Sequence, residues 1–124
     1  MHRILLVFLI LLCLAGCGIK SSRVAEANRS ASRAQAIGGA ILLGYTNDNG
    51  GRLPPYSGWQ SAITPYVPRD LVAHIQEYSY SQSVAGKKLD SINGWTNAEL
   101  LKSNAPGSDG RYVVVYLDGR SDRN

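Results

Sequence analysis

An apolar run near the start of the chain determines how many residues remain to form a folded domain. Residues 4–14 are eleven apolar residues that follow the positive segment ending at Arg3. A helix that spans a bilayer takes about 20 apolar residues, so this run is short for a span and has the length of a signal-peptide core. Small residues, Ala15 and Gly16, follow at once. We expect residues 1–16 to be a signal peptide; the alternatives are an uncleaved anchor or a buried core helix.

The end of this run resembles the lipobox of bacterial lipoproteins, with the residues Leu14-Ala15-Gly16-Cys17. The resemblance implies a diacylglycerol group on the Cys17 thiol and cleavage between Gly16 and Cys17. It also implies acylation of the new amino group, for example with palmitate. Gly18 rather than Asp follows the cysteine, which favours an outer-membrane over an inner-membrane location in the cell envelope.

Cysteine usage agrees with lipidation. Cys13 leaves with the signal peptide, so Cys17 is the single cysteine of the mature chain. A lone cysteine in a secreted protein needs an explanation, and lipidation supplies one. Removal of 16 residues from the 124 leaves 108, enough for one small domain. We expect residues 17–22 to be a lipidated tether and residues 23–124 to be the domain.

Charge is distributed unevenly along the mature chain. Residues 17–69 carry six basic and two acidic side chains, whereas residues 70–124 carry six and seven. The positive part is next to the lipid anchor, which would suit anionic lipid headgroups. A solvated helix surface is the equally weighted alternative.

Residues 23–45 show the periodicity of a helix. Small and apolar residues recur at spacings of three and four and form one stripe, made by Ala27, Ala31, Ala34, Gly38, Ile41 and Tyr45. Gly38-Gly39 weakens the helix but permits close approach of another backbone, and packing is the favoured reason for the pair. The helix should end at residues 47–51, where Asn and Gly tolerate left-handed backbone.

The second half of the chain reads as strands after a short helix over residues 58–66. Residues 77–84 alternate Tyr or Val with Ser, which is typical of a strand with one buried face. Residues 98–102 form a weaker second candidate. Residues 111–117 are apolar on both faces, so this strand should be central or covered by the helix. Asp118-Gly119 is a hairpin turn signal, and residues 120–124 leave room for a short last strand.

One long N-terminal helix followed by antiparallel strands predicts an α+β fold, with the helix packed on a small antiparallel β-sheet. This order of segments resembles the globular heads of pseudopilins, prepilin-like proteins with a C-terminal Asp-Gly motif. The resemblance covers roughly residues 29–121. It is carried by residues 32–37 with Tyr45, residues 49–55, Trp59 with Pro65-Tyr66, residues 78–80 and residues 113–119. It implies a pilin-like head.

The chain departs from that family in three places. Ser108 stands ten residues before Asp118, where the family has His, and Arg120 follows the Asp-Gly. Residues 20–36 are largely polar, so they cannot form the apolar stalk of a filament. The resemblance therefore implies a pilin-like head recast as a lipoprotein.

Residues suited to catalysis or metal binding are few. His74 is the single histidine of the mature chain, and no Gly-x-Ser-x-Gly motif is present. A calcium loop starting at Asn47 would need a bidentate Glu at position 58, where Gly58 stands. We expect no enzyme activity, no cofactor, no metal and no nucleic-acid partner, and a hydrolase ranks third among the functions considered.

Nine aromatic residues of the mature chain could build its core or face outward. The favoured reading is that most of them build the core. Tyr56 and Trp95, both in expected loops, are the candidates for binding a partner or ligand, because exposed aromatics mark interfaces. We expect a non-catalytic envelope lipoprotein with a structural or protein-interaction role. The alternative is a lipoprotein that binds peptidoglycan or another carbohydrate.

Overall fold

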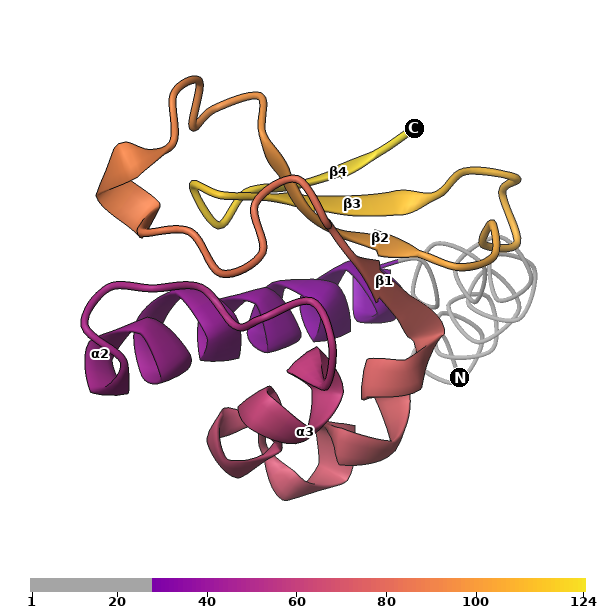
Figure 1. The fold of residues 1–124 in the computed structure, drawn as a ribbon. Coiled ribbons are helices and arrows are strands. Elements are labelled where there is room, and N and C mark those ends of the chain that lie inside the picture. Colours follow the sequence, from indigo (N-terminus) through magenta and orange to yellow (C-terminus); the bar gives the residue numbers. More distant parts are fainter. Residues whose placement is uncertain (1–27) are drawn as a thin grey trace, which may run out of the picture.

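The computed structural model describes residues 28–124, and the first described element is a long helix (Figure 1). The helix has 21 residues: residues 28–39 are α-helical, Ala40–Tyr45 (η1) are π-helical and Thr46–Asp48 (α2) are α-helical again. It ends before Gly50 and Gly51, whose φ angles are +65° and +78°, so the predicted end is confirmed. The signal peptide, the lipidation of Cys17, the tether and the predicted helix start at residue 23 lie outside the described residues.

The buried face of the long helix follows the predicted stripe and then shifts by one residue. Ala34, Gly38 and Ile41 are buried as expected. Tyr45 is only half-buried, and the neighbouring Thr46 is buried instead. The reason is the π-helical segment, in which the Thr46 N–H donates to the carbonyl of Ile41, five residues earlier. This wider turn inserts one residue into the helical repeat. The predicted stripe assumed a regular period, and the prediction was therefore wrong at its C-terminal end.

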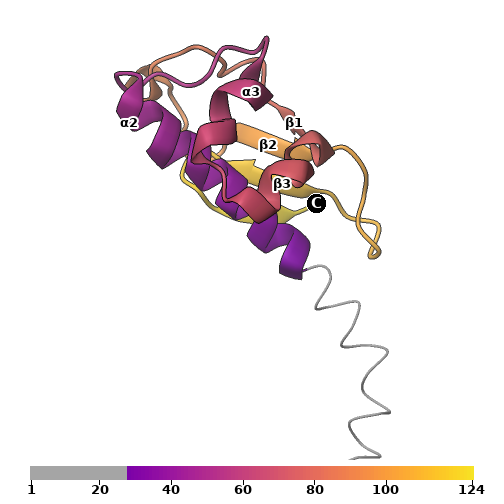
Figure 2. The ribbon, with the colours of Figure 1, turned by 90° about the horizontal axis from the view of Figure 1, so that it is seen from below.

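The sheet has four antiparallel strands in the order β1-β2-β3-β4, which is also their order in the chain. Their bounds are Tyr78–Tyr80 (β1), Glu99–Ser103 (β2), Val113–Tyr116 (β3) and Ser121–Arg123 (β4). The long helix lies across one face of this sheet (Figures 1 and 2). The predicted α+β fold, a long helix packed on a small antiparallel sheet, is therefore confirmed.

The first strand is shorter than predicted. A strand over residues 77–84 was expected, but β1 ends at Tyr80 and the chain then turns. Val84 is nevertheless buried in the core, and its carbonyl accepts a hydrogen bond from the Lys87 N–H. An apolar residue that is buried in a turn can continue the alternating sequence pattern of a strand. The pattern therefore predicted a strand that was too long.

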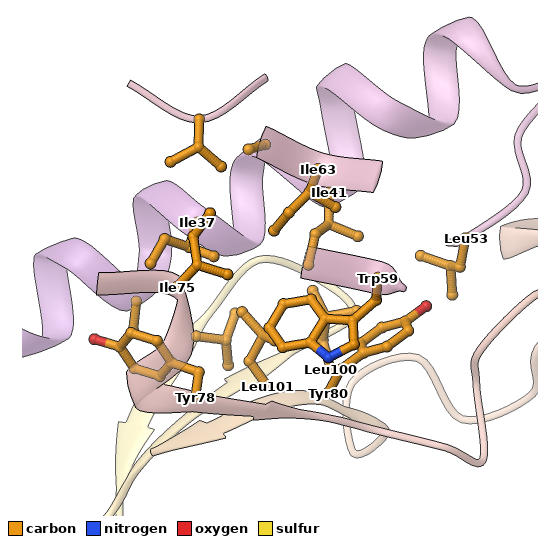
Figure 3. Close-up of a cluster of buried hydrophobic side chains, with 14 of the residues drawn as sticks. Ile37, Ile41, Leu53, Trp59, Ile63, Ile75, Tyr78, Tyr80, Leu100 and Leu101 are labelled. Carbon is orange, nitrogen blue, oxygen red and sulfur yellow. The ribbon is translucent and has the colours of Figure 1, made fainter. Parts of the chain in front are cut away.

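Short helices pack beside the long helix and complete the core. They are α3 (Trp59–Ile63), η2 (Thr64–Tyr66) and η3 (Arg69–Glu77). The short helix expected over residues 58–66 is confirmed. The residues that follow it, Arg69–Glu77, are 3-10 helical. Figure 3 shows Ile37 and Ile41 of the long helix pointing toward side chains of α3 and the strands.

One aromatic pair fixes the centre of this core. The rings of Trp59 and Tyr80 have centroids 5.3 Å apart, and the buried Tyr80 hydroxyl donates to the Pro54 carbonyl at 2.8 Å (Figure 3). Burial raises the pKa of Tyr80 above its ordinary value, because the ionised phenolate would lose solvation. The ring therefore stays neutral and hydrogen-bonded.

Gly38 sets how closely the long helix approaches the sheet. A Cβ atom at this position would lie 2.8 Å from Cγ1 of Val115 in β3, closer than real Cβ contacts allow. A Cβ at the adjacent Gly39 would meet nothing within 4 Å. The predicted packing role is thus confirmed for Gly38, whereas Gly39 lies over open space.

The two faces of the sheet are covered differently. Val113, Val115 and Leu117 face the long helix and belong to the core, so Val114 between them points to the opposite face. Val114 is nevertheless only 1% exposed. On that face Lys102 lies over the ring of Tyr112 and Arg120 over the ring of Tyr116, at 4.8 and 4.6 Å from the ring centroids. Long side chains therefore shield the outer face in place of a second layer.

The hairpin between β3 and β4 has a three-residue loop. The Gly119 N–H donates to the Tyr116 carbonyl at 3.0 Å, and the Tyr116 N–H donates to the Arg120 carbonyl at 2.9 Å. Gly119 has a φ of +86°, and no residue other than glycine has positive φ among residues 28–124. A two-residue type I′ turn requires positive φ at both central positions, so Asp118 excludes it. The arrangement is the type I turn followed by a left-handed glycine.

The two adjacent glycines provide a matched test of the helix–sheet contact. Gly38→Ala should lower the free energy of unfolding by about 1–3 kcal/mol, because the added methyl overpacks the stiff Val115 side chain. Gly39→Ala should be neutral or stabilising by up to about 1 kcal/mol, because alanine favours helix and meets no atom. Denaturant unfolding of the two variants measures the difference. Equal effects of the two substitutions would contradict this account.

The hairpin glycine should also matter for stability. Gly119→Val places a β-branched residue at positive φ, a strain of order 1–3 kcal/mol. Each kcal/mol corresponds to about 4–8 °C in a domain of this size, so the melting temperature should fall by several degrees. Circular dichroism melts would show this, and a variant as stable as wild type would mean that the turn has another conformation.

Candidate functional site

An apolar groove lies between the C-terminal half of the long helix and two loops. Its volume is about 380 Å³. The lining residues come from three segments far apart in the sequence: Gln35, Gly39, Leu42 and Leu43; Leu89 and Trp95; and Leu117, Asp118 and Gly119. We call this the helix groove.

Two of the three large apolar residues that are exposed in residues 28–124 line the helix groove. Leu43 is 70% exposed and Trp95 is 39% exposed. The third, Tyr56, is 51% exposed and does not line the groove. The structure therefore places both predicted binding residues at the surface but does not bring them together. Their role in binding stays a prediction.

Trp95 is held in place by its own segment. Its indole N–H donates to the Leu89 carbonyl at 2.9 Å. Leu89 belongs to the short 3-10 helix η4 (Leu89–Ser91), just before the turn that carries the tryptophan. The turn itself is closed by Gly94, whose φ is +75° and whose carbonyl accepts hydrogen bonds from the Asn97 and Ala98 N–H groups. With its polar atom satisfied, the indole presents mainly apolar surface.

The loop wall of the groove is tied to the rest of the fold at three points. The Leu89 N–H donates to the Gly51 carbonyl at 2.8 Å, just beyond the long helix, and the Leu117 N–H donates to the Ala98 carbonyl at 3.0 Å. The Arg120 guanidinium donates to the Thr96 carbonyl at 2.8 Å. Figure 1 shows this segment, in orange, at the same end of the molecule as α2. The groove is therefore preformed rather than dependent on loop closure.

The groove is nearly free of charge. Asp118 is the single charged residue that lines it, and one of its carboxylate oxygens accepts the Arg120 backbone N–H at 3.0 Å. The Gln35 side chain, which also lines the groove, donates to the Ser121 hydroxyl at 2.8 Å and ties the helix to β4. Such a surface can contact apolar groups in its middle and polar groups at its rim.

His74 lies in a different environment. Its Nδ1 is 3.1 Å from both carboxylate oxygens of Glu77, three residues further along η3. Among residues 28–124, no side-chain hydrogen bond joins His74 to a serine.

Two further searches bear on chemistry and membranes. Residues 28–124 contain no group of three or more His, Cys, Asp or Glu side chains that could hold a metal ion. Over the same residues, no helix has both the length and the apolar character needed to cross a membrane.

Sequence reasoning missed Leu43. The residue follows Leu42 directly and lies off the buried stripe, and a leucine off that stripe is the signal that could have drawn attention to it. Leu89 had no comparable signal, because its place in the groove depends on a long-range contact with the helix.

Comparison with protein-family models, with curated proteins and with solved structures gives no match to this chain. The functional argument therefore depends on the groove and on the sequence motifs.

Proposed function

We propose that this chain is a non-catalytic lipoprotein of the bacterial cell envelope, whose α+β head binds another protein through the helix groove in a structural or interaction role. The observation that carries this proposal is the groove itself, which gathers Leu43 and Trp95 at one preformed surface with a single charged residue in its lining. Exposed apolar groups gathered at one place in this way mark sites of interaction.

The composition of the groove favours a protein partner over a small charged ligand. Four of its nine lining residues are leucines from the helix and both loops, and a tryptophan lines it as well. Tryptophan is among the residues that contribute most to binding energy at protein interfaces, where it packs among apolar neighbours. The polar rim formed by Gln35 and Asp118 would orient the partner.

Anchoring through Cys17 supports the placement in the envelope. The lipobox-like residues 14–17 stand directly after an apolar run of signal-peptide length. Two or more acyl chains hold a protein stably on a membrane, whereas a single chain does so only marginally. The head would then present the helix groove to other envelope proteins from the outer membrane.

The pilin-like character of the head belongs to the same proposal. Its support is the order of elements, a long helix followed by an antiparallel meander, with Asp118-Gly119 in the last hairpin. The polar residues 20–36 replace an apolar stalk, so the head would act singly at the membrane rather than within a filament.

Lipidation can be tested at its single thiol. Cys17→Ser should remove the site of diacylglycerol transfer, so the protein should be released from membranes or remain an unprocessed precursor. Membrane fractionation with mass spectrometry of the N-terminus measures both results. A variant still cleaved after Gly16 and still held by membranes would contradict the lipoprotein assignment.

The groove can be tested with the lipidated protein as bait in detergent-solubilised membranes. Leu43→Glu and Trp95→Ala should each reduce capture of the partner at least about tenfold, because a central apolar contact contributes about 2 kcal/mol or more. Tyr56→Ala is the matched control, since it removes an exposed aromatic outside the groove. Equal capture by wild type and both groove variants, measured by quantitative mass spectrometry, would contradict a role for the groove.

A carbohydrate is the second candidate, and the observation that favours it is the exposed, hydrogen-bonded indole of Trp95 next to Gln35 and Asp118. Ring contacts in residues 28–124 join Tyr45 with Tyr66 and Trp59 with Tyr80, and neither pair includes Trp95 or Tyr56. Without a platform of several exposed rings, the protein partner is favoured. Saturable binding of soluble peptidoglycan fragments that Trp95→Ala abolishes would reverse this order.

A further inference from the structure

The exposed side of the long helix carries a protrusion and a depression four residues apart. Leu43 protrudes, with 70% of its surface exposed. Gly39 lacks a side chain, and a Cβ atom there would meet nothing within 4 Å. Residues four apart lie on the same side of a helix, and both residues line the helix groove.

The same stretch of helix is free of charge. No Asp, Glu, Lys or Arg occurs from Ala34 to Asn47, a run of 14 residues on a helix with one side at the surface. Identical surfaces brought together by a two-fold axis place like charges near one another, and such pairs are unfavourable. An uncharged surface removes this obstacle to pairing between two copies of one chain.

We propose that the helix groove binds a second copy of this chain, with Leu43 of each copy seated over Gly39 of the other. This inference rests on the proposed function, in which the groove binds a protein, and it names that protein. A two-fold interface requires that when one residue contacts a second, the second contacts the first across the axis. A leucine and a glycine on the same side of one helix meet this requirement with two equal contacts.

The geometry of the helix suits this arrangement. With the two-fold axis on the exposed side of the helix, midway between Gly39 and Leu43, the two helices run in opposite directions and each Leu43 faces the Gly39 position of its neighbour. Glycine lets the helices approach closely, and Leu42 and Trp95 line the same groove as Gly39.

The contact is small, and this limits its strength. Stable interfaces bury about 1,200–2,000 Å² in total, whereas the groove is a shallow feature of about 380 Å³. Free in solution, two copies should associate weakly. Anchoring through Cys17 would confine all copies to one surface, where the effective concentration rises and a weak contact becomes occupied.

The experiment places a photo-crosslinking benzoylphenylalanine at position 43 of the full-length protein in its membrane. Irradiation should give a product of twice the chain mass, with the crosslinked peptide mapped to the helix residues around Gly39 of a second, differently tagged copy. The same group at position 56, exposed but outside the groove, should give no such product. Gly39→Leu in the crosslinking protein should reduce the product at least tenfold, because the added side chain fills the depression, where a Cβ atom meets nothing within 4 Å.

The outcomes separate this inference from the proposed function. A crosslink from position 43 to a different envelope protein would overturn the second-copy inference and support the proposed function. A crosslink to residues 17–27 of the same chain, or no crosslink to any protein, would overturn both. A dimer product unaffected by Gly39→Leu would also overturn the arrangement described here.

Discussion

The contact between Gly38 and Val115 is the constraint on which the rest of the structure depends. It places the backbone of the long helix close above β3, because no side chain separates them. At this spacing Ile37 and Ile41 reach the side chains of the sheet and of α3 in one buried cluster. A residue larger than glycine would lift the helix and open the core along its length. The same close approach sets the floor of the helix groove at Leu117.

Local patterns in the sequence were enough to predict the elements but not all their limits. The long helix, the apolar strand and the Asp-Gly turn depend on neighbours in the chain, and each was found. The strand predicted over residues 111–117 is shorter, Val113–Tyr116, and the helical stripe was wrong at Tyr45. The π-helical turn and the early end of β1 were not foreseen. Both depend on whether a residue such as Thr46 or Val84 is buried in the packed structure. The periodicity of the sequence carries no information about this.

The helix groove was beyond sequence reasoning for a related reason. Its walls are brought together by hydrogen bonds across long stretches of chain, such as Leu89 to Gly51 and Leu117 to Ala98. Trp95 was identified as an aromatic residue in an expected loop, where exposed aromatics mark interfaces. Leu43 was not distinguished from the other leucines of the helix. What distinguishes Leu43 is its position off the buried stripe, next to a glycine over open space. Trp95 could thus be identified as a binding residue from the sequence, whereas most of the other residues that line the groove could not.

The two edges of the sheet have a consequence for how copies of this protein behave at high density. Its edge strands, β1 and β4, have three residues each, and β4 is the polar sequence Ser-Asp-Arg. Short edges, of which β4 is also charged, give an extended chain little on which to add a further strand. Crowded molecules are thereby protected from fusing into extended sheets and from the amyloid-like growth that such fusion begins. Contacts between neighbours can then be reversible and made by side chains, which suits a protein concentrated on a surface.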